Sequence, residues 1–305
     1  MKIEIRDIKK SFGDKEVLKG VSFEAESGKA FGLLGRNGAG KTTSIRIIMG
    51  VFYSDSGSIL VDGKPIEREK LRIGYLPEER GLYPKKSISE QLVYFGMLRG
   101  LSKKDARLAA SEWIDKMNLG EYKDKKLETL SKGNQQKIQL AVTLMCNPEL
   151  IILDEPFSGL DPVNAKLLKD IIKEMIEGGA AVIFSSHQMN HIEEFCEDIA
   201  ILNQGRVAIS GNIREIKRSY PRNTIDISST ENKKLSAFIL KKMAGDIEEV
   251  SEDEKSGILT VKLRSPDIKN KLIREISDEG LDIDSFMVRE PSLSDIFVEY
   301  AEGGI

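Results

Sequence analysis

Residues 30–43 read Ala-Phe-Gly-Leu-Leu-Gly-Arg-Asn-Gly-Ala-Gly-Lys-Thr-Thr, and this stretch decides the fold. Its first residues predict a buried strand, and the glycine-rich turn after them opens a segment with helical apolar spacing. Gly35, Gly40, Lys41 and Thr42 stand at the spacing of a phosphate-binding loop, in the strand–loop–helix context that such a loop needs. Glycines let backbone N–H groups converge on an anion, and a helix N-terminus adds the positive end of its dipole. A turn that only joined a strand to a helix would not need lysine followed by threonine.

The loop supplies most of the candidate ligands for a nucleotide. Lys41 offers a cation to the terminal phosphates, and the Thr42 hydroxyl is a ligand that Mg²⁺ accepts. The candidate nucleotide-binding residues of the loop are Gly35, Arg36, Asn37, Gly38, Ala39, Gly40, Lys41, Thr42 and Thr43.

Composition limits the class of protein. A chain of 305 residues can hold one full-sized domain and a smaller one. The net charge of −3 gives no electrostatic attraction to nucleic acid, so no nucleic-acid partner is expected. Cys146 and Cys196 lie in apolar helical surroundings, which indicates a reduced cytosolic protein. Apolar runs stay shorter than the roughly 20 residues that span a bilayer, so we expect this chain not to cross a membrane by itself.

Strand and helix signals continue on both sides of the loop. Residues 2–25 read as strands, and from 87 to 144 the pattern becomes helical, which predicts a helical insertion between two parts of a sheet. The helix that starts at Asp161-Pro162 is expected to bury Val163, Leu167, Ile171 and Met175. Further strands are expected at 58–62, 73–76, 150–153, 180–184, 199–202 and 207–209, and helices at 87–100, 102–117 and 131–145.

A polar stretch at 218–223, which contains Pro221, marks the boundary of a second domain. The predicted elements beyond it follow the order βαββαβ plus a helix, which fits a ferredoxin-like unit. The strands are expected at 224–228, 247–250, 258–263 and 283–288, and the helices at 233–243, 267–277 and 293–300.

Two carboxylates, Asp154 and Glu155, follow the all-apolar strand 150–153. The carboxyl ends of parallel strands are where α/β proteins bind ligands, so we expect both groups to face the phosphate-binding loop. Two acids that merely end a strand are the alternative, which Lys41-Thr42 in the same chain disfavours.

Further motifs stand in the order typical of one family. The chain resembles the nucleotide-binding subunits of ATP-binding-cassette transporters, and most of all the single-cassette subunits of bacterial exporters with an extra C-terminal domain. The resemblance covers residues 1 to about 215, and in the tail it depends on Pro-Ser-Leu-Ser-Asp-Ile-Phe at 291–297. It implies a P-loop NTPase core of the α/β class, with an N-terminal antiparallel β-subdomain, a helical insertion at about 86–146 and ATP and Mg²⁺ as cofactors. The nucleotide-binding domain would span 1–218, and a small α+β accessory domain 219–305.

The resemblance assigns roles at the ends of two strands. Asp154 would hold Mg²⁺ in its outer shell, and Glu155 would polarise the attacking water as general base. His187 resembles the histidine that contacts the γ-phosphate and fixes the water, although a lone histidine is more often structural. His191 would suit a metal pair with it, but because a third ligand is not evident we expect a solvated side chain.

A helix N-terminus at 130–136, Leu-Ser-Lys-Gly-Asn-Gln-Gln, resembles the signature sequence of the family. Lys132 replaces the first of two glycines and Asn134 a glutamine, while Ser131 and Gly133 remain. The resemblance implies that Ser131 and Gly133 face the γ-phosphate bound by the other subunit. Taken alone, Ser131 is an ordinary helix cap.

Three other features resemble the family, and each of them also has another interpretation. Phe12 stands where an aromatic side chain stacks on adenine, or is a core or surface aromatic. Glu78 replaces the usual glutamine that touches Mg²⁺ and the attacking water, so it could bind the metal but adds negative charge. Tyr83, Tyr94 and Phe95 resemble the groove that receives a helix of the membrane partner, or simply pack together.

The resemblance therefore predicts an ATPase, the motor of a membrane exporter that works through separate transmembrane permease subunits at the cytoplasmic face of the membrane. Two such subunits, identical or related, would pair around ATP. The alternatives are an importer motor with a regulatory tail, a soluble cassette ATPase of repair or translation, and an ATP-binding regulator without turnover. The altered signature and Glu78 disfavour the importer motor, and the single phosphate loop disfavours the soluble ATPase of repair or translation. Glu155 with His187 disfavours the regulator without turnover.

Overall fold

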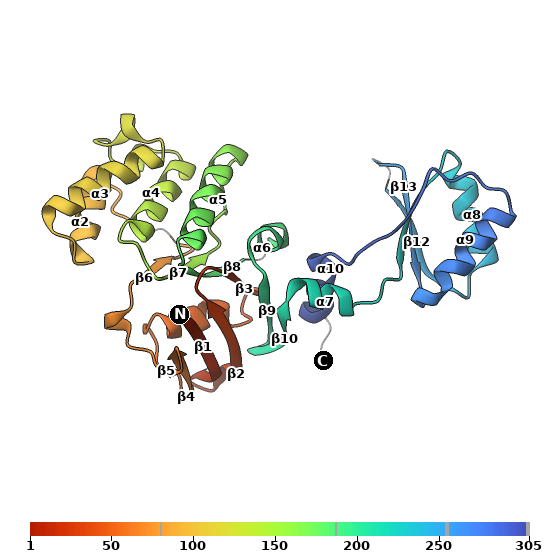
Figure 1. Cartoon of the computed structure of the whole chain (residues 1–305), viewed down its shortest axis with the longest axis horizontal. Coiled ribbons are helices and arrows are strands. Elements are labelled where there is room, and N and C mark those ends of the chain that lie inside the picture. Colours follow the sequence, from red (N-terminus) through yellow and green to blue (C-terminus); the bar gives the residue numbers. More distant parts are fainter. Residues whose placement is uncertain (80, 187, 254–255, 303–305) are drawn as a thin grey trace. The chain divides into compact units, whose positions relative to one another are not determined.

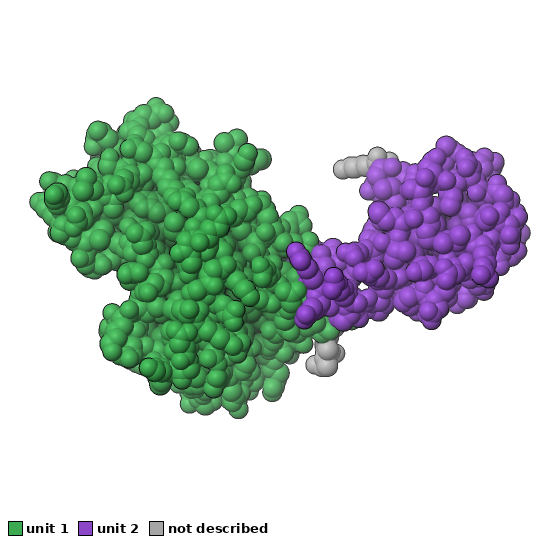
Figure 2. Space-filling model, viewed as in Figure 1, with its two compact units in different colours: residues 1–213, 299–305 green, residues 214–298 purple. Residues whose placement is uncertain are grey.

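The computed structural model describes residues 1–79, 81–186, 188–253 and 256–302. The chain forms two compact units, which Figure 2 distinguishes by colour. One contains Met1–Ile213 together with the residues from Glu299 on, and the other contains Arg214–Val298. The first unit contains two sheets and the second unit one, and each unit has its own hydrophobic core.

A mainly parallel sheet of six strands forms the centre of the first unit (Figure 1). Its strands are β3 (Ala30–Gly35), β6 (Ile73–Leu76), β7 (Leu150–Asp154), β8 (Ala181–Ser185), β9 (Asp198–Asn203) and β10 (Arg206–Asn212). They lie in the order β10-β9-β3-β8-β7-β6, and only β10 runs antiparallel to its neighbour. Because β3, β7 and β8 are buried along their whole length, their sequences are almost entirely apolar.

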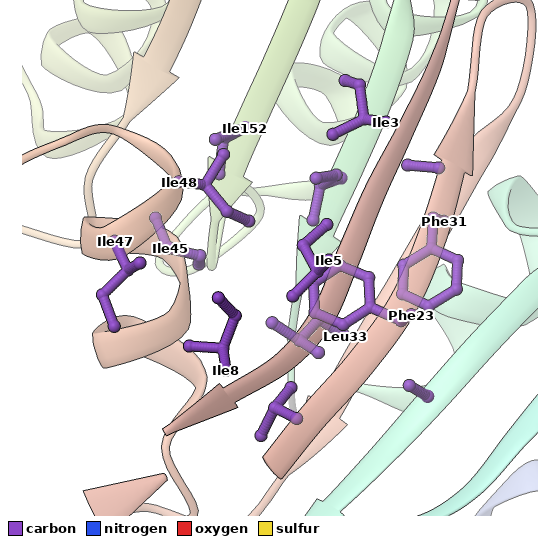
Figure 3. Packing of buried hydrophobic residues seen from close by; sticks show 14 of the residues in the cluster. Ile3, Ile5, Ile8, Phe23, Phe31, Leu33, Ile45, Ile47, Ile48 and Ile152 are labelled. Atoms are coloured by element: carbon purple, nitrogen blue, oxygen red, sulfur yellow. The ribbon is translucent and has the colours of Figure 1, made fainter. Parts of the chain in front are cut away.

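An antiparallel sheet packs against the parallel one. Its strands are β1 (Lys2–Phe12), β2 (Lys15–Glu26), β4 (Ser56–Val61) and β5 (Lys64–Pro65), in the order β2-β1-β4-β5. Figure 3 shows Ile3, Ile5 and Ile8 of β1 in one core with residues of β3 and β7. Phe23 of β2 stacks on Phe31 of β3, with the ring centroids 5.0 Å apart. The predicted N-terminal antiparallel subdomain is confirmed.

Three helices of the first unit begin where the serine capping residues predict, whereas α6 and α7 were not predicted. The Ser87–Glu90 capping box is formed, and Ser102 and Ser131 cap the two helices that follow. The helices are α1 (Lys41–Ile48), α2 (Ile88–Leu98), α3 (Lys103–Lys116), α4 (Lys132–Leu144), α5 (Pro162–Glu177), α6 (Met189–Phe195) and α7 (Ile213–Ser219), which crosses into the second unit. Single 3₁₀ turns lie at Arg68–Lys70, Gly120–Tyr122 and Leu127–Thr129.

The predicted buried face of α5 is right for Ile171, half right for Leu167 and Met175, which are half-buried, and wrong for Val163. Val163 is 79% exposed, whereas Leu168, Ile171 and Ile172 are buried. The helix presents one stripe to the core, and residues at spacings of three and four define it. Val163, in the first turn after Asp161, lies off that stripe.

The second unit has the predicted ferredoxin-like topology. Its elements are β11 (Thr224–Ser228), α8 (Asn232–Lys242), β12 (Ile247–Asp253), β13 (Ile258–Leu263), a 3₁₀ turn (Pro266–Ile268), α9 (Lys269–Asp278), β14 (Ser285–Val288) and the start of α10 (Leu293–Glu302). The antiparallel strand order is β12-β13-β11-β14. Apolar residues of α8 and α9 join those of the strands in one core, which closes this unit.

Candidate functional site

The loop between β3 and α1 has a backbone that only glycine accepts at several positions. Gly38 and Gly40 have φ angles of 84° and 112°, in the left-handed region that disfavours other residues. A Cβ atom at Gly40 would lie 2.5 Å from Leu18 of β2, so a side chain is also excluded by contact. The backbone of Ala39 accepts the Gly205 N–H at 3.1 Å, which anchors the loop to the β9–β10 turn.

Lys41 is held inside this loop. Its side chain is buried, and Nζ donates to the carbonyl oxygen of Gly35 at 2.6 Å and to that of Arg36 at 3.3 Å. Burial lowers the pKa of Lys41, while the charges of Glu155 and Asp154 act in the opposite direction. The cation is therefore desolvated and bonded to neutral carbonyls, so anionic phosphate oxygens would be stronger acceptors for it.

Asp154 and Glu155 are both buried at the end of β7. Burial raises the pKa of Asp154, and the hydroxyl of Ser185, its cross-strand neighbour on β8, partly offsets this. Glu155 has a φ angle of 50°, a left-handed conformation that costs roughly 1 kcal/mol for a residue with a Cβ atom. Its N–H donates to the Ser185 carbonyl at 2.8 Å, which holds that conformation.

Ser186 orients the Glu155 carboxylate, a role that the motif analysis missed. Its Oγ donates to Glu155 Oε2 at 3.0 Å and accepts the Gln188 N–H at 3.0 Å. Because Oγ accepts from the backbone, its single proton is directed to the carboxylate. The available signal was a serine directly after the end of a buried strand.

One pocket of about 570 Å³ collects most of the predicted site residues. This volume lies in the range of small-molecule and cofactor sites. Gln204 and four residues of β2 were not predicted to line it. The described lining consists of Lys15, Glu16, Val17, Lys19, Arg36, Asn37, Gly38, Gly40, Lys41, Thr42, Thr43, Glu78, Asp154, Glu155 and Gln204.

Other predicted residues lie outside this described lining. Phe12 is 44% exposed and packs edge-on against Phe52, with ring centroids 5.2 Å apart. Ser131 caps α4 by accepting the Asn134 N–H, and Gly133 lies in the first turn of the same helix. His187 falls outside the residues that the structure describes. His191 contacts the Phe157 ring at a centroid distance of 4.3 Å, so it is not the solvated side chain that was expected.

The aromatic residues near α2 form a cluster. Tyr83, Tyr94 and Phe95 have ring centroids 5.3 to 6.0 Å apart. Tyr83 and Tyr94 are about half exposed, and Tyr94 also lines a groove with Met97. The rings pack together and remain partly open to solvent.

Comparison with known proteins identifies the family. The profile described as ABC transporter matches residues 18–158. An uncharacterised ABC transporter ATP-binding protein of Bacillus subtilis, YhaQ, is 40% identical over 298 residues, which cover 97% of either chain. This chain belongs to the ATP-binding-cassette (ABC) transporter ATP-binding proteins. It is therefore a cassette ATPase.

Further comparisons of this ABC protein cover the two units together or singly. The linearmycin resistance ATP-binding protein LnrL of Bacillus subtilis is 33% identical over 302 residues, covering 97% of each chain. A second profile, the C-terminal domain of DrrA1-3-like ATP-binding proteins, matches residues 211–301. A solved structure of an ABC transporter ATP-binding subunit is 30% identical with a TM-score of 0.66, and covers 72% of this chain and 92% of that one.

The donors in the pocket fit Mg²⁺, the metal typical of the family. In residues 1–79, 81–186, 188–253 and 256–302, three His, Cys, Asp or Glu side chains nowhere converge to hold a metal by themselves. Mg²⁺ usually takes one or two carboxylates together with substrate phosphates and water. Thr42, Asp154 and Glu78 line one pocket and offer such an incomplete oxygen set.

Within the described part of the chain, every helix is too short or too polar to cross a bilayer.

Proposed function

We propose that this cassette ATPase is the motor of an exporter and acts on separate transmembrane permease subunits at the cytoplasmic face of the membrane. The observation that carries the proposal is the full-length similarity to LnrL, a linearmycin resistance protein, which includes the C-terminal unit. Nod factor export ATP-binding protein I of Paraburkholderia xenovorans, 33% identical over 213 residues that cover 68% of this chain and 70% of the relative, supports the same class.

Binding of the triphosphate begins with Lys41 and the loop. Lys41 Nζ would exchange the Gly35 and Arg36 carbonyl oxygens for oxygens of the terminal phosphates. The left-handed glycines allow the backbone to approach the phosphates closely. Arg36, Asn37, Gly38 and Thr43 complete the wall of the pocket on this side.

Thr42 and Asp154 would hold Mg²⁺, with Glu78 as a further oxygen donor. When bound, the ion would neutralise charge on the phosphate oxygens during transfer.

Hydrolysis requires a base at the γ-phosphate, and we assign it to Glu155. Its carboxylate would accept a proton from water while the water oxygen bonds to the γ-phosphorus and the bond to the leaving ADP oxygen breaks. Ser186 holds the Oε2 atom of this carboxylate at 3.0 Å, which supports a fixed orientation for the base. His187 is assigned to the γ-phosphate by the motif order.

The second half of the site would come from another subunit. Ser131 and Gly133 lie at the N-terminus of α4, away from the described lining of the pocket. A helix N-terminus binds anions, so these residues suit a phosphate held by a partner. Two copies, or this chain and a related one, related by a twofold axis would complete two sites at once.

Isolation of the chain from its native membrane tests this proposal. A tagged chain, purified in detergent with ATP and Mg²⁺, should bring with it a protein with several membrane-spanning helices, identified by mass spectrometry. Ribosomal proteins or DNA in place of such a protein would contradict the exporter assignment. The tagged chain extracted without detergent provides the control.

A further inference from the structure

Helix α4 carries a row of polar side chains toward the nucleotide pocket. Gln136, Gln139 and Thr143 are buried, at 6%, 4% and 1% exposure. Each of them donates to backbone carbonyl oxygens of another segment. Buried polar donors are usually bonded, and these contacts tie the helix to particular loops and strands, while the Gln139 Oε1 atom is buried with no hydrogen-bond partner among the described residues.

Gln139 bonds both sides of the residue that enters the pocket. Its Nε2 donates to the Pro77 carbonyl oxygen at 3.3 Å and to the Glu79 carbonyl oxygen at 3.1 Å. These two carbonyl groups flank Glu78, whose side chain lines the pocket together with Lys41, Asp154 and Glu155. A single amide therefore bonds the backbone on both sides of Glu78.

The same helix also holds the neighbouring elements. Gln136 Nε2 donates to the Pro156 carbonyl oxygen at 3.2 Å, directly after Glu155. The Thr143 hydroxyl lies within hydrogen-bond distance of two carbonyl oxygens, that of Tyr75 in β6 at 3.2 Å and that of Gln139 in its own helix at 2.9 Å. Only Gln139 among these three holds the Glu78 loop itself.

We propose that Gln139 is a positioning residue for Glu78, fixing its carboxylate in the nucleotide site through the backbone of residues 77–79. The inference rests on the proposed function, because it assigns Glu78 to that site. Gln139 lies eight residues after Ser131 on one continuous helix, a rise of about 12 Å. A shift of the Ser131 end on contact with a partner's phosphate would thus move the Glu78 loop with it.

The physical basis is the difference between a loop and a helix. Residues 77–79 lie between β6 and α2, without a regular ladder of backbone bonds. A carboxylate on such a loop loses orientation when its backbone is released, and misplacement by a fraction of an ångström weakens transition-state contacts. Substrate binding depends mainly on the phosphate loop, so it should change little.

Gln139→Met tests the inference in the purified full-length chain. Methionine keeps the length and volume of the side chain but cannot donate to the carbonyl oxygens. We expect kcat for ATP hydrolysis to fall roughly five- to twentyfold, with the KM and the Kd for a fluorescent ATP analogue within about twofold. Thr143→Val is the matched control, since it removes a buried hydroxyl that contacts the Tyr75 and Gln139 carbonyl oxygens but keeps the Gln139 side-chain amide, and it should leave kcat within about twofold.

A double-mutant cycle with Glu78→Ala separates positioning from general destabilisation. If Gln139 acts through the Glu78 side chain, adding Gln139→Met to Glu78→Ala should lower kcat by less than about twofold further. Independent, multiplicative losses would overturn the inference, as would an equal loss in Thr143→Val. If Gln139→Met does not fold, Gln139→Asn replaces it, because asparagine keeps the amide but is one methylene too short to reach both carbonyl oxygens. This variant must then show the same lowered kcat with unchanged KM and Kd.

The failure of the inference and that of the proposed function give different results. A wild-type chain that hydrolyses ATP, with unchanged kcat in Gln139→Met or Glu78→Ala, would overturn only the inference. A wild-type chain that neither binds nor hydrolyses ATP would overturn the proposed function and the inference with it.

Discussion

The sheets of the two units differ in how their faces are covered. Strands β3, β7 and β8 of the first unit are buried at every residue, whereas β13 of the second unit alternates between buried and half-buried residues. Helices α8 and α9 contribute to a core with one face of the second sheet. Asp226 of β11 lies between two core residues of that strand. Its carboxylate accepts two hydrogen bonds from Arg289, at 2.7 and 2.8 Å, and one from Thr260 at 2.9 Å.

The difference explains where the chemistry lies. Parallel strands end at one edge, so Gly35, Asp154 and Ser185 are brought together although they are far apart in sequence. In the antiparallel sheet neighbouring strands end at opposite edges, and its buried polar group is satisfied by an internal ion pair. In the parallel sheet the charged side chains at the strand ends therefore line a pocket. In the antiparallel sheet the buried charge is neutralised by an ion pair within the same unit.

The largest expected effect is on turnover. Lys41→Ala should lower ATP hydrolysis on the order of a hundredfold or more, because it removes a cation from the transition state. Phosphate release measures it. Lys262→Ala, which removes an exposed lysine from the second sheet, is the control and should keep wild-type activity. Near-normal hydrolysis in Lys41→Ala would remove the assignment of this residue.

Glu155→Gln should keep ATP binding and block cleavage, so that paired subunits accumulate. The amide retains the shape of the side chain but cannot accept the proton from water. Size-exclusion chromatography with ATP and Mg²⁺ should show a dimer, and Glu248→Gln in the second unit should not. A variant that binds ATP and stays monomeric would contradict the shared site.

Ile227→Ala should destabilise the second unit and spare the site. Ile227 is completely buried in that core, and truncating such a residue costs about 2–4 kcal/mol of the free energy of unfolding. Urea unfolding measures the loss, and Ile227→Val should lose only about 1 kcal/mol. Turnover per folded molecule should stay within about twofold, because the described lining comes from the first unit alone. A tenfold fall in turnover per folded molecule would contradict the conclusion that the second unit stays apart from the chemistry.

The smallest effect is expected at the ion pair. Arg289→Met leaves the buried Asp226 with fewer donors, but the Arg289 side chain is 44% exposed, so we expect a loss of only about 1 kcal/mol in unfolding free energy. Arg222→Met, which breaks an exposed pair with Glu290, should change it by less than about 0.5 kcal/mol. Equal losses of unfolding free energy in Arg289→Met and Arg222→Met would mean that the burial of Asp226 does not strengthen its ion pair.

Local patterns predicted much of this fold. The glycine spacing before Lys41 predicted the strand–loop–helix unit, and Ser87 with Glu90 predicted the start of α2. The order of elements after residue 223 was sufficient for the ferredoxin-like topology, because short connections leave few ways to arrange four strands. Val163 was predicted wrongly, because the buried residues were placed at a constant spacing of four, which drifts around a helix of 3.6 residues per turn.

Contacts between segments that are distant in the sequence could not be predicted from local patterns. Ser186 and Gln139 are ordinary polar residues in the sequence, and each becomes informative only through the carbonyl or carboxylate that it meets. Phe12 was predicted either to stack on adenine or to be a core or surface aromatic; it packs edge-on against Phe52 and stays 44% exposed, and stacking on adenine remains a prediction. Side-chain partners of this kind depend on packing between elements.

The sequence by itself determined that a phosphate-binding loop precedes a helix and that two carboxylates end a buried strand, because each is a local pattern of residues with one strongly favoured conformation. The tertiary structure alone decided that Gln204 and residues of β2 line the same pocket and that α4 holds the loop of Glu78. Strand order brings residues together across more than a hundred positions, and a local pattern contains no information on such pairing.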